Sequence, residues 1–269
     1  MRRVPFSASI YVRLVGARVR ADWQYRTSFV LLTCSQFLIT FLDFLAIAVV
    51  FTQVPALAGW SFSQVAFLYG TTAVSFMLCD VFVSEVELAE RHVRLGTFDQ
   101  FLLRPAGPLL QLCAHEFALR RAGKLLQALV VLAIAIATVP VEWTVAKALM
   151  TAVTVTAGAV IFSAISVAAS CIAFWFVGTQ EVANSFTYGG NFASQYPLDV
   201  YGVWLRRILV IVPIAFVNYL PATWILDQPD AIGLPGWAAF VSPLVAAMSA
   251  AAAACTWRSA IRHYRSTGS

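Results

Sequence analysis

EVELAERHVRLGTFDQFLLRP, residues 85–105, is the charged island around which this chain is organised. Seven of its 21 residues are charged, although charged residues make up only 12% of the whole chain and hydrophobic residues 60%. Long apolar runs precede and follow the island. In such a chain, a charged island is a candidate for either a docking surface or a reaction site. The choice between these two decides the function.

The flanking apolar runs indicate an integral membrane protein. The mean hydropathy is +0.79, and several runs approach or exceed the roughly 20 residues that span a bilayer as a helix. We expect no cleavable signal peptide, because Arg2 and Arg3 precede a mixed segment rather than a short apolar core. The five cysteines are scattered without a close pair, which favours small apolar fillers over metal ligands or disulfides.

We expect an all-α fold in a single transmembrane domain. Six helices are predicted to span the membrane, at residues 27–51, 65–83, 117–139, 148–177, 208–226 and 234–257. The third has the shortest apolar run, residues 125–139. Residues 1–26 are predicted to form a basic amphipathic helix on the membrane surface. Residues 178–205 are aromatic and broken by glycine, which favours a segment lying in the membrane plane.

The distribution of positive charge predicts the orientation. With six spans, 17 of the 18 Lys and Arg residues fall on one side of the membrane, and only Lys147 falls on the other. Positive residues accumulate on the cytoplasmic side. We therefore expect the island and both termini, including the basic tail 258–269, to be cytoplasmic. The same distribution accounts for the net charge of +5 without nucleic acid as a partner.

The motifs that catalysis needs are missing from the sequence. It contains no HExxH, paired-aspartate or Gly-x-Ser-x-Gly motif, and all three histidines fall on the predicted cytoplasmic side. It contains no Gly-x-x-x-x-Gly-Lys-Ser/Thr loop either, because Gly123-Lys124 lacks both the earlier glycine and the following hydroxyl. We expect no enzyme activity, cofactor or metal on this chain. If ATP drives it, another subunit hydrolyses the ATP.

Asp43 is the only charged residue well inside a predicted span. Acids within a membrane are expensive and are functional by default, so an ion pathway through Asp43 is one hypothesis, although no second buried charge supplies a relay. A structural role is the other, with Asp43 hydrogen-bonded to a neighbouring helix or facing a wet cavity. The rival functions are thus an ATP-independent channel or proton-coupled carrier centred on Asp43, and a membrane scaffold without transport.

The island itself is predicted to fold as a helix, a turn and a helix. Gly96 can end the first helix and Thr97 can cap the second, with Asp99 in its first turn. An apolar patch for a soluble partner would follow the turn, made by Phe98, Phe101, Leu102 and Leu103 and ending at Arg104 and Pro105. Charged residues before the turn would set the register of docking: Glu85, Glu87, Glu90, Arg91 and Arg94. The alternative is a membrane-surface hairpin with no partner.

RLGTFDQFLLRPAGPL, residues 94–109, resembles a motif of the membrane subunits of ABC-2 type transporters. These are six-helix permeases that pair with separate ATP-binding subunits. PIAFVNYLPATWIL, residues 213–226, and the tail SAIRHYRSTGS, residues 259–269, are similar to the same family. The likeness covers essentially the whole chain, and it is strongest to a bacterial subgroup of export-type permeases of about 260 residues.

The resemblance implies that residues 85–105 contain a coupling helix that sits in a groove of the ATPase. It implies a working unit of two ATPases and two permeases, identical or related, with ATP and magnesium on the ATPases. Export across a bacterial inner membrane is implied by the likeness rather than by any residue. No substrate role for Asp43 is implied, and the sequence does not identify the transported substrate.

Overall fold

The computed structural model describes residues 16, 26–104, 107–114, 121–176 and 178–264. These residues form helices joined by turns and short loops, as expected for an all-α fold. Almost all of the predicted amphipathic arm, residues 1–26, lies outside the described residues. Pro105 and the last residues of the tail also lie outside them.

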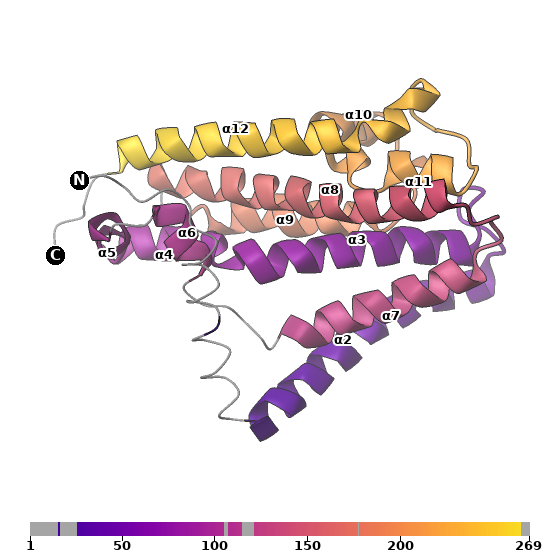
Figure 1. The fold of residues 1–269 in the computed structure, drawn as a ribbon, viewed down its shortest axis with the longest axis horizontal. Helices are drawn as coiled ribbons and strands as arrows, with labels where there is room; N and C mark the ends of the chain where they lie inside the picture. The colour runs from indigo at the N-terminus through magenta and orange to yellow at the C-terminus, as the bar shows by residue number, and fades with distance from the viewer. Residues whose placement is uncertain (1–15, 17–25, 105–106, 115–120, 177, 265–269) are drawn as a thin grey trace.

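Long helices form one bundle (Figure 1). They are α2 Arg26–Gln53, α3 Phe62–Val83, α7 Ala122–Thr138, α8 Val145–Ser170, α9 Gln180–Ser194 and α12 Ser242–His263. The shorter elements are η1 Ser84–Leu88, α4 Ala89–Arg94, α5 Phe98–Leu103, α6 Pro108–Cys113, η3 Cys171–Phe174, η4 Leu198–Val200, α10 Val203–Ile211, η5 Ile214–Phe216, α11 Tyr219–Ile225 and η6 Gly236–Phe240. Figure 1 shows α4, α5 and α6 at one end of the bundle, which we call the island end. The α2–α3 and α7–α8 turns lie at the other, the far end.

Several of these helices can cross a membrane. Four are long and apolar enough among the described residues, at Thr27–Gln53, Phe62–Val83, Val145–Phe174 and Ser242–His263, and the number rises to five if the bent pair α10 and α11 is counted as one span. The apolar helix α7 has 17 residues. The chain is therefore a multi-pass membrane protein.

Helix α3 is the centre of the bundle. Within its apolar window 83% of the residues are buried, whereas the corresponding figure for α2 is 11%. The difference arises because α7, α8 and α9 all pack on α3, while α2 packs mainly on α7. Gly158 of α8 permits a close approach, since a Cβ there would lie 2.8 Å from Ser75 Oγ of α3. A displacement of α3 therefore reaches three neighbouring helices directly.

The segment predicted as one span over residues 208–226 is not one straight helix but the bent pair α10 and α11, a broken span or a re-entrant loop, which we call the hairpin. Its helices are bent by 77° across the break that contains Pro213. The Arg206 guanidinium joins the two sides of the hairpin by donating to the carbonyl oxygens of Asp199, at 2.8 Å, and Ala231, at 3.2 Å. The chain therefore enters and leaves the hairpin at the same end of the bundle.

That end is the far end. Asp199 Oδ2 accepts hydrogen bonds from Trp60 Nε1, beside the α2–α3 turn, at 3.1 Å and from the Tyr219 hydroxyl at 3.0 Å. Lys147, at the start of α8, forms an ion pair of 2.6 Å with Asp227. Arg206, in the hairpin, therefore lies at the far end with Lys147. The predicted distribution of positive charge placed Arg206 on the same side as the island, and the structure corrects this placement.

Residues 178–205 were predicted to lie in the membrane plane, but Gln180–Ser194 of this segment form α9, which runs along the bundle from the island end to the far end (Figure 1). Its buried side is a stripe of small residues, Ala183, Thr187, Gly190 and Ser194. This stripe packs tightly, since a Cβ on Gly190 would lie 2.9 Å from Ile214 Cδ1 of the hairpin. At the far end of α9, Thr72 Oγ1 of α3 donates to the Ser194 carbonyl oxygen at 2.9 Å.

Candidate functional site

The island folds as a helix, a turn and a helix, as predicted. Helix α4 ends before Gly96, whose φ of +69° is the left-handed conformation that glycine adopts without strain. Asp99 lies in the first turn of α5. Thr97 does not cap α5, because its hydroxyl is hydrogen-bonded to His92 Nδ1 at 2.9 Å. The turn is thus tied back to α4.

The predicted apolar patch is divided between the inside and the outside of the protein. Phe98 is 0% exposed and Phe101 is 4% exposed, so neither is available to a partner. The Phe98 ring lies 5.2 Å from that of Phe174, after α8, and 6.3 Å from that of Trp257 in α12. Burial of aromatic rings in edge-to-face contact is strongly stabilising. Phe98 therefore anchors the island to the bundle.

Two acidic residues of the island, Glu85 and Glu90, are also buried. Glu90 is 8% exposed, and its carboxylate accepts hydrogen bonds from the backbone N–H of Gly178 at 2.8 Å and of Gln180 at 2.7 Å. These contacts place a negative charge at the N-terminus of α9, where it is favoured by the unpaired N–H groups and the helix dipole. Glu85 is 5% exposed. Both carboxylates are thus buried, and the register role predicted for Glu85 and Glu90 in docking stays a prediction.

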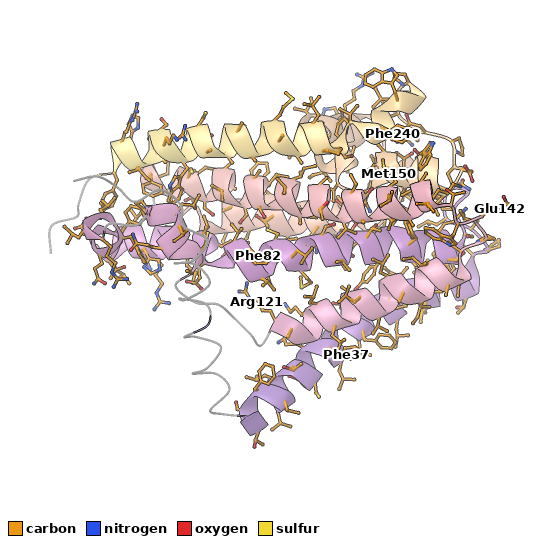
Figure 2. The ribbon with its side chains drawn as sticks, viewed as in Figure 1. Phe37, Phe82, Arg121, Glu142, Met150 and Phe240 are labelled. Carbon is orange, nitrogen blue, oxygen red and sulfur yellow. The ribbon has the colours of Figure 1, made fainter. Side chains whose placement is uncertain are left out.

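Glu87 and Asp80 extend this network between the island and the helices. The Tyr188 hydroxyl of α9 donates to Glu87 at 3.2 Å. Burial raises the pKa of Glu87, and the nearby negative charge of Asp80 adds to the rise. Arg121, labelled in Figure 2, lies 2.6 Å from the buried carboxylate of Asp80. The island end of α3 is thereby joined to the start of α7, whose sequence gave no sign of this partner.

The outward surface of the island is a mixture of leucine and arginine that we call the tip. It consists of exposed residues on α4, α5 and the adjoining turns: Arg91, Arg94, Leu95, Gln100, Leu103 and Arg104. Leu95 is 54% exposed and Leu103 is 82% exposed, whereas Leu102 and Asp99 are only half-exposed. The sequence reasoning missed Leu95, although its place directly before Gly96 puts it on the turn.

Asp43 lies away from the island, in a cleft between α2, α3, α7 and α9. The cleft has a volume of about 500 Å³ and contains both polar and apolar side chains. Asp43 lines this cleft from an exposed position on α2. None of the described island residues, 85–104, lines this cleft. The docking surface and the polar cleft are thus separate features of the described part of the chain.

These features define a class of protein. A bundle of membrane helices with a polar cleft inside it and an anchored helical segment projecting from one end has the architecture of a membrane transport component. The family model described as ABC-2 family transporter protein matches residues 37–268 of the chain. The chain therefore belongs to the ABC-2 transporter family, whose members are the membrane permeases of ABC transporters and work with an ABC ATPase. No curated protein and no solved structure matches the chain significantly.

Proposed function

We propose that this chain is the permease of an ATP-driven exporter in a bacterial inner membrane, and that the tip of the island docks onto the ATPase. The observation that carries this proposal is the division of the island into two sides. Its inner side is anchored by Phe98 and Glu90, while its outer side exposes leucines next to arginines. Apolar contacts supply affinity in a groove, and the positive charges set orientation.

The inner anchors give a path for force from the tip to the bundle. The island continues directly from α3 through η1, reaches the ends of α8 and α12 through Phe98, and holds the start of α9 through Glu90. When ATP closes the ATPase dimer, a rigid-body shift of the island displaces these helices together. Such a shift opens the cleft toward the other face of the membrane.

The complete unit in this proposal contains two permeases, identical or related, and two ATPases. ATP and magnesium bind to the ATPases, because the permease sequence has no phosphate-binding loop. The direction of transport is assigned as export on the likeness to export-type permeases. The surrounding lipid is the remaining partner of the apolar outer surface.

We propose six crossings, formed by α2, α3, α7, α8, α9 and α12. An even number places both termini on the same side as the island, which we assign to the cytoplasm. The positive-inside rule supports this assignment. Described Lys and Arg residues at the island end are Arg26, Arg91, Arg94, Arg104, Arg121, Lys124, Arg258 and Arg262, against Lys147, Arg206 and Arg207 at the far end.

Charged substitutions at the tip test the docking surface. Replacing Leu95 and Leu103 together by Asp is expected to lower co-purification of the ATPase at least tenfold, because each change places a carboxylate in an apolar contact. Both side chains are exposed, so membrane insertion and thermal stability should be unchanged. The matched control is Trp237→Asp, an exposed apolar residue in η6. Undiminished co-purification with the double variant would overturn the docking model.

A further inference from the structure

The cleft that contains Asp43 has an amphipathic lining. Hydrogen-bonding side chains come from several helices: Thr40, Asp43, Gln127, Asn191, Gln195 and Tyr196. They are interleaved with the large apolar side chains of Phe76, Met77 and Phe192. Ligand sites combine mostly apolar walls with a few convergent polar groups in this way. The lining therefore suits a solute that has both a polar group and an apolar body.

The charges in the cleft are unevenly compensated. Asp43 makes no hydrogen bond or ion pair with any residue that the structure describes. Lys124 also lines the cleft, but it acts electrostatically on Asp80, the carboxylate that Arg121 contacts. Lys124 thus has a negatively charged neighbour in Asp80, whereas no ion pair gives Asp43 a positively charged partner among the described residues. Asp43 is exposed where it lines the cleft, so a cation or water can reach it, as an unpaired acid at membrane depth requires.

Two amide side chains in the same lining also have an atom without a hydrogen-bond partner. Asn191 Oδ1 is shielded from solvent and has no hydrogen-bond partner in the described part of the protein. Gln127 is 2% exposed, and its Nε2 lies beside the Tyr69 hydroxyl without an acceptor in hydrogen-bond geometry. Buried polar groups normally have partners. Both amides line the cleft. A solute with N–H donors that binds there can therefore donate the hydrogen bond that Asn191 Oδ1 lacks.

We propose that this cleft binds amphipathic solutes that carry a protonated amine, as the substrate class of the transport function proposed above. The ammonium group binds the Asp43 carboxylate and donates to Asn191 Oδ1, while the apolar body packs on Phe76, Met77 and Phe192. The negative charge selects the cation, and the apolar walls select against small hydrated ions. Asp43 is thus a substrate-binding residue rather than part of a proton relay.

The test compares two probes that differ in one charge. Monodansylcadaverine has a fluorescent aromatic body and a primary ammonium, and its N-acetyl derivative is uncharged. Binding is measured by fluorescence titration of the full-length chain in nanodiscs of zwitterionic lipid, without ATPase. The variants are Asp43→Asn, which removes the charge, Asp43→Glu, which keeps it, and Glu142→Gln as a matched control. Glu142 is exposed at the far end, outside the cleft (Figure 2).

The amine is expected to bind the wild-type chain about 10- to 100-fold more tightly than the acetylated probe, as a charged hydrogen bond predicts. Asp43→Asn should remove this difference, while Asp43→Glu and Glu142→Gln should retain it. Equal binding of the two probes to the wild type, or no binding of the amine, overturns the proposal. So does full retention of amine binding in Asp43→Asn.

Failure of this test is distinguishable from failure of the proposed function, because the titration contains no ATPase. If the chain recruits the ATPase through its tip but binds both probes equally, the proposed substrate class is overturned and the proposed coupling to the ATPase stands. If the chain selects the amine through Asp43 but recruits no ATPase, the proposed coupling is overturned and the proposed substrate class stands.

Discussion

Replacing Phe98 by alanine is expected to separate ATP hydrolysis from movement of the membrane helices. The Phe98 ring is fully buried among the rings of Phe174, Trp257 and Tyr264. Truncating a buried phenylalanine to alanine destabilises proteins by about 3–5 kcal/mol through lost contacts and the cavity left behind. Here the loss falls at the joint between the island and the ends of α8 and α12. We expect a lower melting temperature, retained ATPase binding and loss of transport in the assembled complex.

The matched control for Phe98→Ala is Leu102→Ala, in the same short helix. Leu102 is only partly buried, so its truncation removes less packing and should leave most of the transport. Phe98→Leu, which refills part of the cavity, should restore part of the stability. An unchanged melting temperature and normal transport in Phe98→Ala would show that the ring does not anchor the island.

Replacing Glu90 by alanine is expected to loosen the start of α9 and to uncouple transport. The substitution leaves the N–H groups of Gly178 and Gln180 without their carboxylate acceptor. Loss of a helix cap lowers stability by about 0.5–2 kcal/mol, and an unpaired buried N–H adds to that loss. Hydrogen exchange should rise at residues 180–184 while the tip still recruits the ATPase. Transport by the reconstituted complex should fall even though ATP is hydrolysed.

Two variants sharpen the Glu90 experiment. Glu90→Gln keeps acceptor atoms but removes the charge, and it should have an intermediate effect. Glu87→Ala is the control, because it removes a single bond of 3.2 Å to Tyr188 and should cause a smaller loss. Unaltered hydrogen exchange at the start of α9 in Glu90→Ala would contradict the proposed link between the island and α9.

The helical fold and the turn of the island follow from local sequence signals. Gly96 marks the turn because only glycine adopts a positive φ there without strain. Crossings were harder to predict, since hydropathy does not separate a span from an apolar re-entrant hairpin. Residues 208–226 were predicted as a span for this reason, and Pro213, at the break between α10 and α11, was the one visible signal of the bend.

Helix α9 was missed for the converse reason. It contains Gln180, Glu181 and Asn191 and has little apolar character, because one of its sides faces the polar cleft. Its small residues instead pack against the bundle.

The roles of the island residues could not be assigned from sequence alone. Phe98 and Leu103 are both apolar and five residues apart, yet one is 0% exposed and the other is 82% exposed. Whether an apolar residue faces the protein or a partner depends on tertiary packing by α8 and α12. The acids had the same ambiguity, because a carboxylate suits both a docking surface and an internal helix cap.

Photo-cross-linking from the tip tests the central claim most directly, because it reports contact between the island and the ATPase. A benzophenone amino acid replaces Leu103, and a matched one replaces Trp237 in η6, since both side chains are well exposed. We expect a covalent adduct with the ATPase from position 103 and none from position 237. An ATPase that co-purifies with the permease but forms no adduct from position 103 would contradict the claim.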